Sequence, residues 1–292
     1  PEDIMRSINS AFANNYLVVK VVGVAHQTLK IKNLELKASP ENTFVVPRIL
    51  LHLDKEASLQ CEVNLMSTEI HLMDGIVDVY LSSGGKLDLA MTLKSSNDSS
   101  LILSNRVKMC DNSQLNVGLL AQGSKLTRVD QQVFIEGECC QADIAIVYQA
   151  KEHQQVDIHS TVNHLCPRGK SFQNIKGILE DKSRAIVNGR IYIQQGAQEV
   201  DSHLLNNNLL LSDNAEVNTK PELEVEADNV KAAHGATVGQ LDKEELFYCA
   251  TRAIDEKLAR NLILKGFLLD AFNQNPFFVK SELLSSIEVT LD

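Results

Sequence analysis

Apolar and polar residues alternate in short segments that recur along the first half of the chain. Three of these segments begin at Leu59, Leu87 and Leu115, so their starts are 28 residues apart. Alternation with a period of two predicts a short strand with one buried face. A turn-like stretch precedes each segment, at 55–58, 83–86 and 111–114. Strands and turns at one fixed spacing predict coils of chain that stack on each other.

A second series with the same period comprises Val79, Val107 and Ile135. Further along, the apolar pattern predicts less regular strands at 142–148, 156–162, 185–193, 209–211 and 223–227. One coil cannot bury its inward side chains alone, whereas stacked coils bury them against their neighbours. We therefore predict a mainly β fold built as a solenoid.

Polar residues flank the later strands in two informative ways. Asn206, Asn207 and Asn208 form either an amide ladder at a corner of the solenoid or a polar loop. Acidic residues alternate with apolar ones from Glu222 to Asp228, which gives one acidic and one apolar face. Since no His or Cys joins these carboxylates, a solvated outer face is favoured over a metal site.

The pattern changes from strands to helices near residue 241. Asp242 is a suitable N-cap, and Glu245 follows three residues later. A second helix is predicted over 255–272, before Pro276. Its expected buried stripe contains Leu258, Leu262, Ile263, Phe267, Leu268 and Ala271. These patterns divide the chain into a β domain over 1–240 and a helical domain over 241–292.

Composition narrows the function classes. The 292 residues carry a net charge of −10, and aromatic residues make up only 5%, with no Trp. This argues against a nucleic-acid binder, which needs a basic face and stacking platforms. No apolar run is long enough to cross a membrane, and the first residues do not resemble a signal peptide. Six Cys without a CxxC pair favour a reducing, cytoplasmic compartment.

Short motifs give no catalytic centre. The stretch 168–171 resembles the end of a phosphate-binding loop, but His164 stands where that motif needs Gly. His159, His164 and Cys166 lack a fourth zinc ligand, so structural packing is favoured for them. The neighbours Cys139 and Cys140 are expected to be ordinary core residues rather than a redox pair.

A long ordered series of residues resembles one known family. The series includes Lys176–Leu179, 182–185, 188–190, 206–212, 219–221 and above all the segment 227–241. It is similar to the SufB/SufD family of iron–sulfur cluster assembly proteins over about 157–271. Gly235 follows His234 where SufB sequences usually carry Glu, so the SufD branch is the better match.

The resemblance implies a right-handed parallel β-helix and a non-catalytic scaffold subunit of the SufBCD complex. The implied partners are SufB and the ATPase SufC, with a homodimer as the alternative for the isolated chain. ATP would bind to SufC, and an iron–sulfur cluster would be held only transiently in the complex, with no cofactor bound stably by this chain.

The resemblance also implies roles for particular residues. His234 matches a proposed cluster ligand at the SufB interface, beside which Lys231, Gly235 and Thr237 are expected. The expected SufC dock contains Leu246, Phe247, Tyr248 and Arg252 in the C-terminal helices.

The sequence departs from the family in two places. Many SufD sequences have Cys two residues before the His, where this chain has Ala232. The helical region that usually precedes the β-helix is expected to be absent or trimmed. A rival hypothesis is a polysaccharide-active β-helix enzyme, but the sequence shows no acidic pair in a groove and few aromatic residues for sugars.

Overall fold

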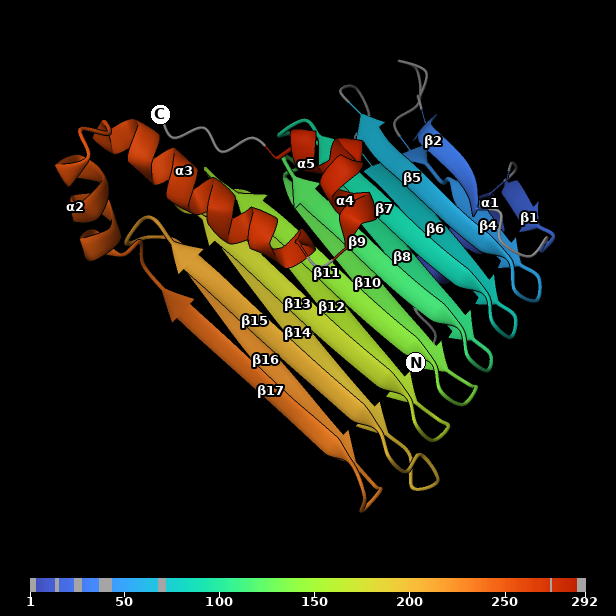
Figure 1. The fold of residues 1–292 in the computed structure, drawn as a ribbon. Helices are drawn as coiled ribbons and strands as arrows, with labels where there is room; N and C mark the ends of the chain where they lie inside the picture. The colour runs from blue at the N-terminus through green and yellow to red at the C-terminus, as the bar shows by residue number, and fades with distance from the viewer. Residues whose placement is uncertain are drawn as a thin grey trace.

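The computed structural model describes residues 4–13, 16–23, 28–36, 44–67, 72–273 and 275–287. Within them the chain winds as a parallel β-solenoid whose coils contribute strands to two sheets (Figure 1). The nine-stranded sheet A contains β1 (Leu17–Val21), β3 (Phe44–Val45), β4 (Arg48–Leu53), β6 (Leu72–Leu81), β8 (Ser100–Met109), β10 (Leu126–Ile135), β12 (Gln155–His164), β14 (Arg184–Ile193) and β16 (Glu216–Val225). The eight-stranded sheet B contains β2 (Thr28–Leu36), β5 (Ser58–Ser67), β7 (Lys86–Ser95), β9 (Gln114–Gln122), β11 (Gln141–Ala150), β13 (Lys170–Leu179), β15 (Asp201–Leu210) and β17 (Lys231–Gly239). The predicted solenoid is confirmed.

The first predicted series is a true structural register. Leu59 pairs with Leu87, and Leu87 pairs with Leu115, on neighbouring strands of sheet B. All three side chains are buried between the sheets. The 28-residue period therefore corresponds to one coil of the solenoid in this region.

The second series is only partly correct. Val79 pairs with Val107, but Val107 then pairs with Val133, and Ile135 lies beside Met109. The coil that joins β8 to β10 is two residues shorter than 28, so the register moves while the apolar alternation continues. A shift by two keeps the same face buried, and for this reason Ile135 still fits the pattern.

Tight corners hold one edge of the solenoid together. The φ of Asn112 is 55° and that of Gly84 is 73°, in the left-handed region, and Glu56, Cys139, Arg168 and Glu199 adopt the same conformation at the equivalent corners. The backbone N–H of Gly84 donates to the Asp111 carbonyl at 2.8 Å, and that of Asn112 donates to the Glu138 carbonyl at 2.8 Å. A left-handed residue reverses the chain within a short turn and aims its N–H at the next coil. Backbone hydrogen bonds therefore join the predicted turns of consecutive coils to each other.

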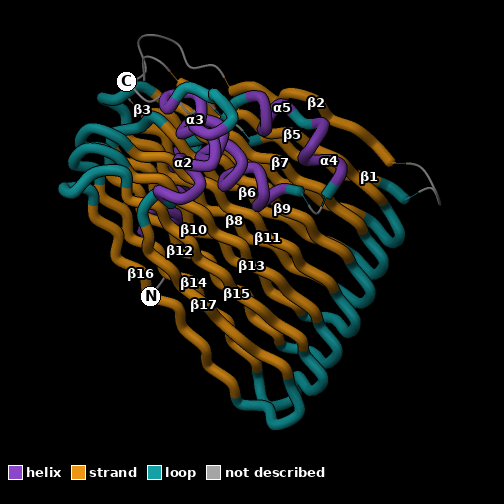
Figure 2. Tube along the Cα trace, turned by 60° about the vertical axis from the view of Figure 1, so that its left-hand side comes forward, coloured by secondary structure: helices purple, strands orange, loops and turns teal. Residues whose placement is uncertain are grey.

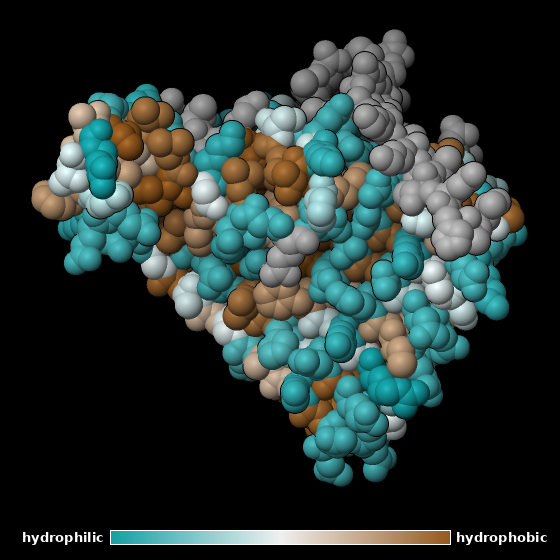
Figure 3. Space-filling model, viewed as in Figure 1, coloured by the Kyte–Doolittle hydropathy of each residue, from teal (hydrophilic) through white to brown (hydrophobic). Residues whose placement is uncertain are grey.

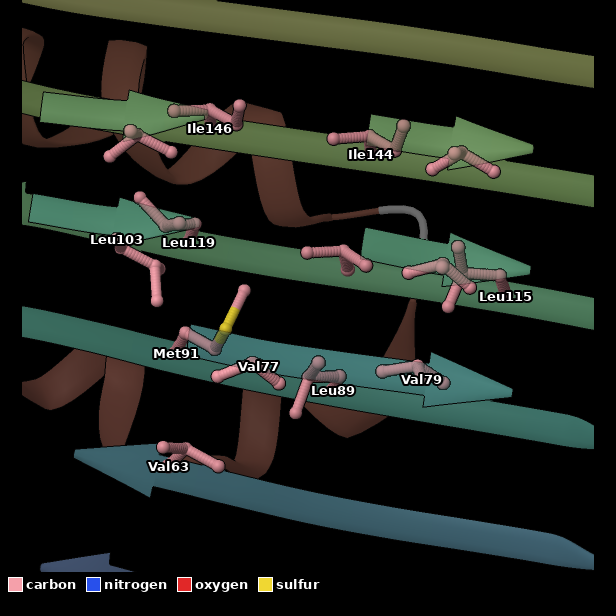
Figure 4. Close-up of a cluster of buried hydrophobic side chains, with 14 of the residues drawn as sticks. Val63, Val77, Val79, Leu89, Met91, Leu103, Leu115, Leu119, Ile144 and Ile146 are labelled. Atoms are coloured by element: carbon pink, nitrogen blue, oxygen red, sulfur yellow. The ribbon is translucent and has the colours of Figure 1, made fainter. Parts of the chain in front are cut away.

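The main core lies between the two sheets. Leu89, Leu115 and Ile146 of sheet B lie in one buried cluster with Val79 and Leu103 of sheet A (Figure 4). Aliphatic side chains dominate this layer, as stacked coils of similar width require.

The helices lie at the two ends of the chain. They are α1 (Ile4–Phe12), α2 (Lys243–Thr251), α3 (Glu256–Leu269), the 3-10 turn η1 (Asp270–Phe272), α4 (Pro276–Lys280) and α5 (Glu282–Ser285). Figure 2 shows the C-terminal helices grouped on the outside of the strands of sheet B. The Asp242 side chain caps α2 as predicted and accepts from the Glu244 N–H at 2.8 Å. No helix among the described residues is long and apolar enough to span a membrane.

The buried stripe predicted for the second helix is wrong in part. Leu258 and Leu262 are exposed, whereas Leu264 and Leu268 are fully buried against the outer face of sheet B. The apolar residues of α3 nearly encircle it, so their pattern alone did not select the face that meets the sheet.

Candidate functional site

The last coil of the solenoid is open at one end of the molecule. β16 pairs only with β14, and β17 pairs only with β15, so both sheets end here in an edge strand (Figure 1). No strand among the described residues covers either outer edge. Unpaired backbone N–H and C=O groups of such edges readily pair with another chain.

The inward rows of this coil form an uncovered apolar layer. Leu223 pairs with the buried Ile191 and Val225 with the buried Ile193, so both point into the solenoid. Nevertheless Leu223 is 38% exposed, Val225 39% and Val238 of β17 50%. The same positions one coil earlier are buried, because a following coil covers them. We define this open end as the inward rows and free edges of β16 and β17.

His234 lies in the inward row of β17. It pairs with the buried Leu204 of β15 and is flanked on the same face by Ala232 and Ala236. The His234 side chain is exposed because no later coil covers it. The described residues contain no cluster of three His, Cys, Asp or Glu that could bind a metal ion. The open end therefore presents one imidazole within a row of small apolar residues.

The three other residues predicted at this interface lie on the outer face of β17. Lys231 and Thr237 are exposed, and the Thr237 hydroxyl donates to the Asn207 side chain at 2.7 Å. Gly235 is half-buried beneath Leu205. They border the same free edge as His234 but on the opposite side of the sheet.

Acidic residues line the outer face of β16, as predicted. Glu224 forms an ion pair with Arg190, and Glu222 forms one with Lys220. The hydrogen bond from Lys220 is the main cause that lowers the pKa of the Glu222 carboxyl. These carboxylates are neutralised by neighbours on a solvated face.

The Asn run lies inside a strand, so both readings of it as a corner or a loop are wrong. Asn206 and Asn208 are buried between the sheets, and Asn207 lies on the outer face of β15. The Asn208 amide donates to the Asn206 side chain at 2.9 Å, and the Tyr148 hydroxyl donates to Asn208 at 2.5 Å. These hydrogen bonds satisfy polar groups that the alternating pattern alone would not place in a core.

A second exposed apolar surface lies on α2 and α3. Phe247 is 72% exposed and Tyr248 60%, and the guanidinium of Arg252 lies over the Tyr248 ring at 5.3 Å from its centroid. Leu246 is half-buried. Leu258 and Leu262 extend this surface along α3, and Figure 3 shows apolar side chains gathered on the same part of the molecule. We call these residues the α2–α3 surface; the sequence missed its α3 half by placing both leucines in the core.

The remaining motifs serve the fold. Arg168 occupies a left-handed corner that leads into a strand rather than a helix, so no phosphate-binding loop forms. His159 lies on the outer face beside Asp157, whereas His164 is fully buried in the core, so they do not share a metal site. Burial lowers the pKa of His164 to about 4.

The two adjacent cysteines differ from each other. Cys140 is buried, as expected for a core residue, but Cys139 is exposed. The reason is that they lie at a corner, where Cys139 has a φ of 56°, and not in a strand.

Comparison with known proteins identifies the family. Residues 36–267 match the family model for the SufBD core domain of the SUF iron–sulfur cluster assembly system. A Synechocystis protein named as a SufBD family member of iron–sulfur cluster assembly is 27% identical over 94% of this chain and 63% of its own length. The iron–sulfur cluster assembly protein SufD of Escherichia coli is 37% identical over 50% of this chain and 34% of its own length. SufD of Bacillus subtilis is 27% identical over 59% of this chain and 39% of its own length.

The chain thus spans less than two thirds of the length of these relatives. The matched region contains the whole solenoid from β5 to β17, the open end with His234 and most of α3. From this match over most of its length, the chain belongs to the SufBD family of iron–sulfur cluster assembly proteins.

Proposed function

We propose that this chain is a non-catalytic scaffold subunit of a SufBCD complex, which pairs with SufB through the open end and with SufC through the α2–α3 surface. The observation that carries the proposal is the uncovered apolar layer of the last coil, where Leu223, Val225 and Val238 are exposed. Contact of these apolar side chains with water is unfavourable. A partner that covers them is stabilised by the free energy of apolar burial.

The free edges support a partner of the same architecture. A second β-solenoid can add strands to β16 and β17, which continues both sheets and covers the apolar layer at once. SufB, as the paralogous subunit, is such a partner. A second copy of this chain has the same free edges and apolar layer. Pairing of the chain with itself is therefore the alternative result of the test below.

The α2–α3 surface supports a separate partner. Phe247 and Tyr248 are exposed on α2, which packs against α3, and Leu258 is exposed on α3, whose other side is anchored to sheet B. Exposed aromatic side chains next to an Arg are typical anchors of protein interfaces. SufC would bind here, and ATP would bind to SufC.

We further propose that His234 contributes one ligand to the cluster that the complex assembles. A neutral imidazole is a suitable ligand for iron, and the open end places it in the proposed interface. Ala232 on the same face offers no thiolate, so the thiolates are expected from SufB.

Co-purification tests both interfaces with matched variants. Val238→Asp should abolish retention of SufB, whereas Ile186→Asp, an exposed apolar position on the outer face of sheet A, should leave it intact. Phe247→Asp should abolish retention of SufC, whereas Val279→Asp on α4 should not. The proposal is wrong if the two interface variants retain their partners, or if the chain pairs only with itself when SufB is present.

A further inference from the structure

A cavity lies between the outer face of sheet B and the C-terminal segment, away from the open end and from the α2–α3 surface. It has a volume of about 440 Å³. Strands β7, β9, β11 and β13 form its floor, and η1 and α4 form its opposite wall (Figure 1). Three rings line it: Phe172, Phe272 and Phe278. The cavity thus combines an aromatic wall with a polar floor.

The floor contains two carboxylates that differ in the number of hydrogen bonds they accept. Asp88 accepts from the side chains of Gln60 at 2.9 Å, Asn116 at 2.8 Å and Asn275 at 2.9 Å. Its role is to fasten α4 to the sheet. Asp143 lies two strands away in the same row and accepts a single side-chain hydrogen bond, from Gln141 at 2.8 Å.

Asp143 has no countercharge within the described part of the chain, where no cation forms an ion pair with it. Burial accordingly raises the pKa of the Asp143 carboxyl above its ordinary value. A half-buried carboxylate without a countercharge is unfavourable, and a bound cation would remove that penalty.

A second acceptor lies beside this carboxylate. Asn174 is only 8% exposed, and its Oδ1 is buried with no hydrogen-bond partner among the described residues. It pairs with Ala145, two residues after Asp143 on the neighbouring strand, so the two side chains are diagonal neighbours on one face. A buried amide oxygen without a hydrogen-bond partner is unfavourable relative to a satisfied one.

We propose that this cavity binds a small organic cation, a primary ammonium or guanidinium group on an apolar body. Asp143 accepts one hydrogen bond but has no countercharge, and the Asn174 oxygen has no donor among the described residues. An ammonium or guanidinium group supplies a positive charge and donors only. The rings of Phe272 and Phe278 suit the apolar body and add attraction for the charge. A metal ion is disfavoured, because the described residues provide no set of three acidic, His or Cys ligands here.

The test uses the full chain and three probes of one shape. Phenethylammonium, phenethyl alcohol and 3-phenylpropionate differ mainly in charge, and their binding is measured by ligand-observed NMR and calorimetry. We expect saturable binding of the cation and none of the anion or the alcohol. Equal binding of all three probes, or of none, would overturn the proposal.

Variants then assign the site. Asp143→Asn should weaken the binding of phenethylammonium about tenfold or more, since a charge-assisted hydrogen bond is lost. Asn174→Leu should also weaken it while the melting temperature stays level or rises, because the unpaired oxygen is removed. Asp213→Asn, an exposed corner residue, is the matched control and should bind normally. Unchanged affinity in both cavity variants would place the cation elsewhere and refute the site.

Discussion

The ring of Tyr148 occupies the space that a side chain at Gly177 would need. Tyr148 of β11 and Gly177 of β13 are partners in the register of sheet B, and an ideal Cβ at 177 would overlap the tyrosine ring. Tyr148 is fully buried, and its hydroxyl donates to Asn208. The Gly within the family-like segment Lys176–Leu179 therefore has a packing role in the core.

Gly177→Ala should strongly destabilise the solenoid. The added methyl group overlaps a fully buried ring whose hydroxyl is hydrogen-bonded to Asn208, and overpacking of this kind costs about 1–3 kcal/mol or more. Denaturant unfolding measures the change. Gly266→Ala is the control, because nothing lies within 4 Å of that position in α3, and it should be neutral or stabilising. If Gly177→Ala costs the same in a Tyr148→Ala background, the ring is not the cause.

His164 should make stability pH-dependent. Its pKa is about 4 in the folded chain, because burial disfavours the charged ring, and 6.5 in the unfolded chain. Above pH 6.5 both states are neutral and the stability is complete. As the pH falls from 6.5 to 4, only the unfolded state takes up the proton, so about 3 kcal/mol is lost progressively.

The measurement compares unfolding free energies of the natural chain and His164→Gln across this pH range. The difference between them should shrink as the pH falls. An identical slope for both proteins would contradict the assignment, and exposed His153→Gln should leave the slope unchanged.

The ion pair between Lys176 and Asp270 should matter unequally for its two members. The Lys176 ammonium contacts the Asp270 carboxylate at 2.6 Å and lies over the Phe267 ring at 4.8 Å from its centroid, with Lys176 buried and Asp270 exposed. Asp270→Asn leaves a buried ammonium without its countercharge and should cost about 1–3 kcal/mol. Lys176→Met leaves only a solvated carboxylate and should cost less. Chemical denaturation ranks the two, and the reverse order would refute this reasoning.

His234→Ala should lower the cluster yield of the reconstituted complex without weakening the subunit contacts. The imidazole is exposed in the inward row and forms no part of the buried core, so folding should be unaffected. Iron and sulfide analysis after anaerobic assembly measures the yield, and co-purification measures the contacts. An exposed outer-face residue, His203→Ala, is the control. A normal yield in His234→Ala would remove the ligand role.

The sequence predicts the solenoid well where coils have equal length. Leu59, Leu87 and Leu115 reveal the period because their corners are all of one kind. The predicted pairing of Ile135 is wrong because the coil from β8 to β10 is two residues shorter than 28. A change of two residues cannot be detected in an apolar pattern that repeats every two residues. The strand β13 escaped detection because Gln173 and Asn174 interrupt its apolar alternation.

Only part of the candidate site could be predicted from the sequence. The family-like segment located His234, but sequence cannot show that Leu223 and Val238 belong to the last coil and remain uncovered. Exposure at an open end depends on where the stacking stops, which is a property of the whole fold. The short helix α1 over Ile4–Phe12, with the Asn9 amide donating to the Asp74 carbonyl at 2.5 Å, was likewise not predicted. It is short, and its contacts are with strands distant in the sequence.

Hydrogen exchange of β16 and β17 with and without SufB tests the central claim most directly. In the free chain, the outward-pointing amides of both edge strands should exchange fast, because no described strand accepts from them. In the complex, the same amides should become protected while those of β5 to β9 stay unchanged. Protection elsewhere with no change in β16 and β17 would contradict pairing through the open end.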